Sequence, residues 1–211
     1  KSLFEGIDIT WNRVAGGAAI APLVQALESS FDFKSPSKSI PQLLRIHQSI
    51  LALPASDWKR IKLADCEKLI KDCLGLFVEL RTNKFKASPG SELLVTLEVI
   101  NRSNTEVRLV SMEVTSNDNV FALPSTLVYN QGYTKELTIQ TPEQLSIPYW
   151  LIKHPEEGMY KVDQQKKRGT PADPPSITAA VKIEINGTSI TLQAPVIYKT
   201  VDPAEGEVIR P

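Results

Sequence analysis

The stretch from residue 176 to residue 199 constrains the fold most, because it predicts a β-hairpin together with its register. On each side of Asn186-Gly187, apolar residues alternate with polar or small ones, which is the period of a half-buried strand. Asn186 and Gly187 both tolerate positive φ, so they suit a two-residue type I′ turn. The apolar pairs expected across that turn are Ile183 with Ile190 and Val181 with Leu192. The hairpin therefore predicts part of the fold, and its residues indicate no functional site.

The N-terminal third of the chain has helical periodicity. After Gly16-Gly17, apolar residues recur at positions 20, 23, 24 and 27, as on one face of a helix. A second apolar stripe runs from Ile40 to Leu51, with Pro41 tolerable in the first turn and Pro54 ending the helix. A third helix follows, capped by Ser56 or Asp57. Short connections between helices of this length predict a small antiparallel bundle.

Around Gly75 the apolar period changes from 3.6 to 2, and we place a boundary there. Residues 1–75 are expected to form an N-terminal segment plus the helical bundle, and residues 76–211 a β-domain. Within the strand at 107–114 the apolar parity slips by one residue, which predicts a β-bulge. Seven or so short strands with turns between them favour an antiparallel immunoglobulin- or fibronectin-III-like β-sandwich. The predicted fold class is therefore α+β, with a polar tail at 201–211.

Composition excludes some classes of function. Among 211 residues, 24 basic side chains balance 24 acidic ones, which argues against a nucleic-acid partner. No apolar run approaches membrane-spanning length. The chain starts at Lys1 without a signal peptide, so we expect a mature or excised piece of a longer protein. Cys66 and Cys73 lie two helical turns apart, about 10 Å, beyond the ~7 Å limit for a disulfide, and are expected to be free.

Residues of catalytic type do not form a catalytic pattern. His47 lies on the apolar stripe of the second helix, where a buried, hydrogen-bonded role is expected. His154 precedes Pro155 and two glutamates in a Pro-rich loop, without a second histidine nearby to complete a metal site. The usual hydrolase, phosphate-loop and zinc motifs are absent from the sequence. We therefore predict no catalytic residues, no metal ligands and no cofactor in this chain, and no enzymatic activity of its own.

Residues 142–176 form a long connection with many prolines and glycines, either an ordered excursion or partly disordered. The aromatic residues Tyr149, Trp150 and Tyr160 in it could plug an open end of the sandwich, face another domain or stack on a sugar ring. The basic run at 166–168 is expected to be solvated. As a binding hypothesis, Tyr149, Trp150 and Tyr160 are the candidate substrate-binding residues.

The N-terminal segment has no clear period but carries apolar side chains that could dock on something. Phe4, Ile7 and Trp11 are the candidate domain-docking residues. They could instead pack against the rest of this chain, and the sequence leaves the two alternatives open.

Several short sequence segments, taken in order, resemble those of a known family. They are residues 3–13 (Leu-Phe-Glu-Gly-Ile-Asp-Ile-Thr-Trp-Asn-Arg), Phe31-Asp-Phe-Lys34, Ile100-Asn-Arg-Ser103, Pro148-Tyr-Trp-Leu151, Gly158-Met-Tyr160, Pro195-Val-Ile-Tyr-Lys199, Asp202-Pro203 and Gly206-Glu-Val208. Together they resemble the region downstream of the catalytic domain in large Bacteroidetes-type deacetylases of the PIG-L family. That family is related to LmbE and to N-acetylglucosaminyl-phosphatidylinositol de-N-acetylases.

The resemblance implies a non-catalytic accessory region of an exported, periplasmic, zinc-dependent deacetylase that acts on an N-acetylated sugar. The family's zinc site begins with His-Pro-Asp-Asp in a Rossmann-like domain, and His154-Pro-Glu-Glu157 has only a superficial likeness to it. Zinc is therefore expected only in a catalytic domain outside this chain. The implied partner is that upstream domain of the same polypeptide, with a glycan as a further possible partner. The alternative is a stand-alone carbohydrate-binding module.

Overall fold

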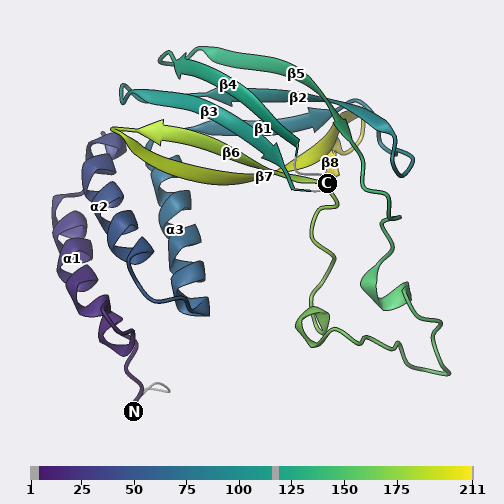
Figure 1. Ribbon diagram of the computed structural model, residues 1–211, viewed down its shortest axis with the longest axis horizontal. Helices are drawn as coiled ribbons and strands as arrows, with labels where there is room; N and C mark the ends of the chain where they lie inside the picture. Colours follow the sequence, from purple (N-terminus) through teal and green to yellow (C-terminus); the bar gives the residue numbers. More distant parts are fainter. Residues whose placement is uncertain (1–4, 116–118, 211) are drawn as a thin grey trace.

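The computed structural model describes residues 5–115 and 119–210 (Figure 1). Within these residues, three α-helices precede an eight-stranded sheet. The helices are α1 (Ile20–Ser30), α2 (Ile40–Leu51) and α3 (Asp57–Cys73). The strands are β1 (Phe77–Thr82), β2 (Glu92–Ile100), β3 (Val107–Val114), β4 (Asn119–Leu127), β5 (Gly132–Gln140), β6 (Thr178–Ile185), β7 (Thr188–Asp202) and β8 (Gly206–Arg210). In Figure 1 the helices lie together on one side of the curved sheet.

The helices form where the periodicity predicts them. Ser56 is the cap of α3, since its hydroxyl accepts a hydrogen bond from the Lys59 N–H at 3.1 Å. Pro41 occupies the first turn of α2, where its missing N–H would have had no partner inside the helix. The apolar face of α2 is buried, and α2 contacts both α1 and α3. His47 belongs to that buried face, and its Nε2 lies 3.4 Å from Glu67 Oε1, as the prediction of a buried histidine requires.

The hairpin and the bulge are confirmed. Ile183 lies opposite Ile190, and Val181 lies opposite Leu192. Asn186 and Gly187 have φ of 49° and 75°, as a type I′ turn requires. In β3 the pairing shifts between Leu109 and Ser111 on both neighbouring strands, at the parity slip seen in the sequence.

The predicted antiparallel immunoglobulin- or fibronectin-III-like sandwich is wrong. The strands form a mixed, barrel-like sheet that is nearly closed, in the order β4-β3-β6-β7-β1-β2-β5, with β8 added beside β7. β7 runs parallel to β1, with Leu80 opposite Val196 and Thr82 opposite Tyr198. The reason is the length of β7. Its first half pairs with β6 and its second half with β1 and β8, so the strands are joined into a continuous curled sheet.

The helices and the sheet share a hydrophobic core. Buried side chains from α2 and α3 continue into those of β1, β2, β3 and β6 without a break. Leu74 and Leu76, on either side of Gly75, both belong to that core. Gly75 has a φ of 58°, and its N–H and that of Leu76 bond back to the last turn of α3, as in a glycine-ended helix. The domain boundary between residues 1–75 and 76–211 stays a prediction.

The cysteines are free thiols within the helical part. Cys66 is buried on α3, with its Sγ 3.7 Å from the Leu43 carbonyl oxygen. Burial raises the pKa of the Cys66 thiol to about 12, and the nearby Glu67 carboxylate adds to that shift. Cys73 is half-buried, and its pKa is also raised by burial. Both thiols are therefore protonated at neutral pH and poor nucleophiles.

Within residues 5–115 and 119–210, none of the helices has the length and hydropathy needed to cross a membrane.

Candidate functional site

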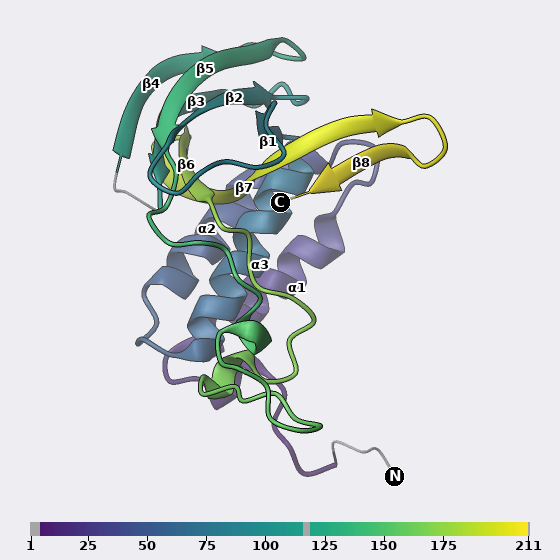
Figure 2. The ribbon, with the colours of Figure 1, turned by 90° about the vertical axis from the view of Figure 1, so that its right-hand side faces the viewer.

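The connection between β5 and β6 is the longest one between consecutive strands of the sheet. We call residues 141–177 the arm. It leaves the curved sheet on the same side as the helices but extends apart from them (Figures 1 and 2). It contains two 3₁₀ turns, Tyr149–Leu151 and Gln165–Lys167, and no named strand. The sequence left open whether this connection is ordered, and its contacts give it a defined shape.

Tyr149 is the residue around which the arm folds. It is buried, although it lies outside the main hydrophobic core. Its N–H donates to Asp173 Oδ2 at 2.7 Å, and its hydroxyl donates to the Thr170 carbonyl oxygen at 2.9 Å. Its ring meets that of Trp150 edge to face, with centroids 4.9 Å apart. Tyr149 therefore joins the outgoing and returning halves of the arm.

Asp173 is the second anchor. Its other oxygen, Oδ1, accepts a hydrogen bond from Lys167 Nζ at 2.8 Å, and that ammonium also lies 6.0 Å from the Tyr149 ring centroid. The Lys167 hydrogen bond and the Tyr149 N–H lower the pKa of the Asp173 carboxyl. The carboxylate therefore remains charged at neutral and mildly acidic pH, and the polar anchor persists over that range.

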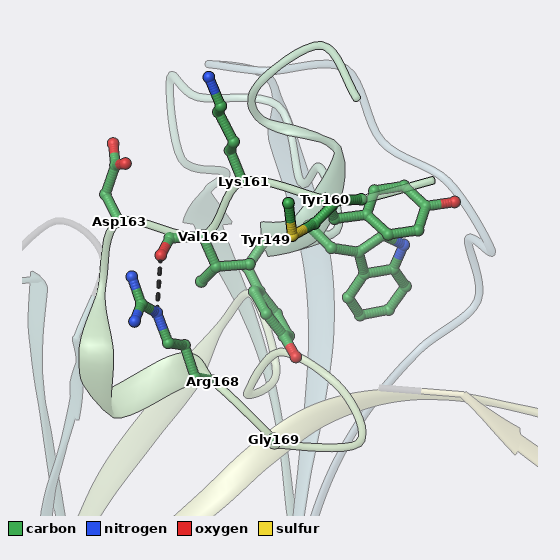
Figure 3. Close-up of a pocket in the computed structure, with 9 residues that line it drawn as sticks. Tyr149, Tyr160, Lys161, Val162, Asp163, Arg168 and Gly169 are labelled. Atoms are coloured by element: carbon green, nitrogen blue, oxygen red, sulfur yellow. Dashed lines mark hydrogen bonds between the residues drawn. The ribbon is translucent and has the colours of Figure 1, made fainter. Parts of the chain in front are cut away.

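Further polar contacts fix the returning half of the arm. Arg168 Nε donates to the Val162 carbonyl oxygen at 2.9 Å, a bond drawn in Figure 3. Lys153 pairs with Asp163 at 2.6 Å, and Lys161 pairs with Glu156. These ion pairs are exposed, so each contributes little stability by itself. Together with the Tyr149 anchor they hold a segment that has little hydrophobic core of its own.

Large apolar side chains of the arm point to solvent. They are Leu145, Ile147, Leu151, Ile152, Met159 and Tyr160, each about half exposed or more. Single exposed apolar residues are ordinary on protein surfaces, but several on one short segment are not. The arm thus combines a fixed backbone shape with an apolar exterior.

A cavity of about 710 Å³ opens beside two of these residues, Met159 and Tyr160 (Figure 3). Tyr149, Trp150, Met159, Tyr160, Lys161, Val162, Asp163, Arg168 and Gly169 line it. In Figure 3 the charged ends of Lys161 and Asp163 extend away from the rings of Tyr149 and Tyr160. The cavity has the size of a small-molecule or peptide side-chain site, which lies roughly between 300 and 1,000 Å³.

The structure brings the three aromatic candidates together at this cavity but gives them different surroundings. Tyr149 has its polar groups occupied within the arm, Trp150 is half-buried, and Tyr160 is 56% exposed. Their assignment as substrate-binding residues stays a prediction.

The N-terminal docking candidates lie elsewhere. Phe4 is outside the described residues, and Ile7 is exposed. Trp11 is half-buried and packs edge to face on Trp58, with ring centroids 6.4 Å apart. The ring of Trp58 also lies 5.0 Å from the Arg13 guanidinium carbon. The Trp11 side chain is therefore partly covered by contacts within this chain. Of the two described candidates, Ile7 is the more exposed.

No cluster of three or more His, Cys, Asp or Glu side chains suited to a metal ion occurs in residues 5–115 and 119–210. His154 is exposed in the arm, and its neighbour Glu156 pairs with Lys161.

Sequence reasoning missed Lys167 and Asp173. The run at 166–168 had the appearance of a solvated loop, whereas the structure gives Lys167 a hydrogen bond to Asp173 and Arg168 one to a backbone carbonyl. Lys167 and Asp173 are six residues apart, which matches no helix or strand period. No sequence signal therefore distinguished this pair from ordinary surface charges.

The comparisons with known proteins are sparse. No family model matches the sequence, and no curated protein matches it. Among solved structures, the Pseudomonas fluorescens alkylpurine DNA glycosylase AlkC, bound to DNA containing an abasic site analog, aligns with 83% of this chain at 8% identity and a TM-score of 0.26. The aligned region spans 51% of that chain. At this similarity the match carries no argument about fold or function.

Proposed function

We propose that this chain is a non-catalytic accessory region of a larger exported deacetylase, and that the arm docks it onto the catalytic domain of the same polypeptide. The observation that carries the proposal is the arm itself. Its backbone is fixed by Tyr149, Asp173 and Lys167, yet its exterior carries Ile152, Met159 and Tyr160 exposed to solvent.

Two physical arguments support docking. Covering exposed apolar side chains with a partner removes apolar area from water, which is favourable by about 25 cal/mol per Å² before the costs of association are subtracted. A segment that already has its bound shape loses little conformational entropy on association. The composition also fits, because aromatic residues and methionine are enriched at protein interfaces. Leu151, Ile152 and Met159 would form the centre, and the ion pairs Lys153–Asp163 and Lys161–Glu156 would lie at the rim.

The nature of the partner rests on the sequence resemblance to the PIG-L deacetylases. In that setting the zinc ion and the hydrolysis of an N-acetyl group belong to the partner domain. This chain would position that domain or its sugar substrate, in the periplasm or another exported location. Ile7 of the N-terminal segment could add a second contact to the same partner.

The test uses the full polypeptide with Ile152→Glu and Met159→Glu combined. Two buried carboxylates should weaken docking, so trypsin should cut after Lys153 and Lys161 roughly tenfold faster than in the unmodified polypeptide, the factor that corresponds to about 1.4 kcal/mol. Val128→Glu is the control, because Val128 is also an apolar residue that is more than half exposed, and it lies outside the arm. Equal cleavage rates in all three proteins would contradict the docking proposal.

A second candidate function is glycan binding at the cavity of the arm. The specific observation in its favour is that Trp150 and Tyr160 line a cavity of about 710 Å³ together with the charged residue Arg168. Aromatic faces with nearby polar groups suit a sugar ring. If this function holds, we expect residues 1–211 to bind neutral glycans on an array, and Trp150→Ala to abolish that signal. An array without any signal would count heavily against it.

A further inference from the structure

A second aromatic surface lies where β1, β7 and β8 run side by side, at the base of the β7–β8 hairpin that extends from the sheet in Figure 2. Thr82 and Arg210 are both register partners of Tyr198, one on each neighbouring strand. Phe85, just beyond the end of β1, packs on Tyr198 with ring centroids 5.6 Å apart. The Arg210 guanidinium carbon lies 5.1 Å from the Phe85 centroid. The strand register thus fixes two aromatic rings and a cation together.

These residues border a hollow of about 380 Å³. Three hydroxyl side chains, Thr82, Ser146 and Ser176, also line it. Ser146 and Ser176 come from the two ends of the arm, so the hollow lies between the sheet and the arm's base. Its size falls in the range of ligand sites, and its lining mixes aromatic, hydroxyl and charged groups.

The charge at this hollow is unbalanced. Among residues 5–115 and 119–210, the Lys84, Lys86 and Arg210 side chains form no ion pair with a carboxylate. All three line the hollow. Lys199 follows Tyr198 in β7 and therefore points to the opposite face of the sheet. Unlike the three cations of the hollow, it is paired with carboxylates. Its ammonium pairs with Glu79 at 3.1 Å and with Glu207 at 3.0 Å.

The nearest carboxylate on the same face of β7 already has a structural role. Asp202 Oδ1 accepts hydrogen bonds from the Ala204 and Glu205 N–H groups and thereby closes the β7–β8 turn. Asp202 and Glu205 line a neighbouring hollow of about 310 Å³, which shares Phe85, Tyr198 and Arg210 with the first. Lys84 and Lys86 therefore line only the first hollow, the two carboxylates line only the second, and Arg210 lines both.

We propose that the hollow lined by Phe85, Tyr198, Lys84, Lys86 and Arg210 binds an acidic carbohydrate, a sugar that carries carboxylate or sulfate groups. The cations bind the acidic group, the rings contact the apolar face of the sugar, and the hydroxyls of Thr82, Ser146 and Ser176 bond to its hydroxyls. An acidic peptide is the weaker fit, because peptides commonly add along a free strand edge, whereas this hollow lies over the Tyr198 face of the sheet.

This site shares none of its lining residues with the cavity of the arm and does not depend on the proposed docking. The two can therefore fail separately. Loss of sugar binding leaves the docking proposal untouched, and failure of docking leaves the sugar site untouched.

The test measures binding of residues 1–211 to polygalacturonate, dextran sulfate, neutral dextran and polyglutamate at low and high salt. We expect binding to polygalacturonate, dextran sulfate or both, which separates carboxylate from sulfate recognition. Phe85→Ala should weaken it roughly tenfold, as should the combined Lys84→Ala and Lys86→Ala. Lys135→Ala is the control for loss of a surface lysine, because Lys135 is exposed on β5 and does not line the hollow; this variant should bind as the unmodified chain does.

Phe85→Leu keeps the apolar volume and removes the aromatic face, so an intermediate affinity with an unchanged thermal transition supports the sugar contact. Trp150→Ala should leave this binding unchanged. Three results would overturn the proposal: no binding to either acidic polysaccharide, equal binding to polyglutamate, or equal binding by the Phe85 and Lys135 variants.

Discussion

Replacing Ile183 by alanine is expected to lower the free energy of unfolding by about 3 kcal/mol, within the range of 2–5 kcal/mol known for buried aliphatic truncations. Ile183 is fully buried in β6, which lies between β3 and β7. It pairs with Leu109 on one side and Ile190 on the other. Removing its side chain leaves a cavity that the curled sheet cannot collapse without moving both neighbouring strands. Urea unfolding followed by circular dichroism measures the loss.

The matched control is Lys182→Ala. Lys182 is the preceding residue of β6 and is exposed, since successive side chains of a strand point to opposite faces. Its truncation should change the free energy of unfolding by less than about 0.5 kcal/mol. Comparable losses for the two variants would mean that the register of the hairpin is not the one described.

Tyr149→Ala is expected to release the arm and to leave the rest of the fold intact. The substitution removes the ring and the hydroxyl bond to Thr170 and leaves the Asp173–Lys167 pair without its aromatic cover. Trypsin should then cut within 161–168 at least roughly tenfold faster, because about 1.4 kcal/mol of local stability corresponds to that factor. The urea midpoint of the sheet should hardly move, because Tyr149 lies outside the main core.

Two further variants test this role of Tyr149, one at the same position and one at Tyr160. Tyr149→Phe loses only the hydroxyl bond to Thr170 and should accelerate cleavage less than Tyr149→Ala. Tyr160→Ala removes a ring that is already exposed and should leave the cleavage rate of the free chain unchanged. If Tyr149→Ala were cut no faster than the unmodified chain, Tyr149 would not hold the arm together.

Local patterns predicted the local parts of this fold. The turn at Asn186-Gly187, the pairing of Ile183 with Ile190 and the bulge after Leu109 all follow from neighbouring residues, and the structure has them. The helix cap at Ser56 follows in the same way. Each depends on side-chain period or on φ preference within a few residues.

Long-range pairing was not predictable from these patterns. β1 and β7 lie far apart in the sequence, and their apolar alternation is the same whether they pair parallel or antiparallel. The prediction therefore chose the commoner antiparallel sandwich and was wrong. No strand was predicted in the polar tail either. Gly206–Arg210 forms β8, an edge strand beside β7, because the Asp202 side chain and the positive φ of Gly206 turn the chain back on itself.

At the candidate site too, the local features could be predicted and the long-range contacts could not. The aromatic residues of the arm and its unusual length were visible in the sequence. The Tyr149–Asp173 hydrogen bond joins residues on opposite halves of the arm, and no spacing rule connects them. The unbalanced cations around Phe85 depend on β8, which the sequence did not predict, because Arg210 comes beside Tyr198 only through that strand.

Amide hydrogen exchange across residues 147–162 tests the central claim most directly. The measurement compares residues 1–211 alone with the full polypeptide. If the arm docks on the catalytic domain, amides around Ile152 and Met159 should exchange at least roughly tenfold more slowly in the full polypeptide, while those of the buried strand β6 stay equally protected in both. Equal exchange of the arm in the two proteins would contradict the account.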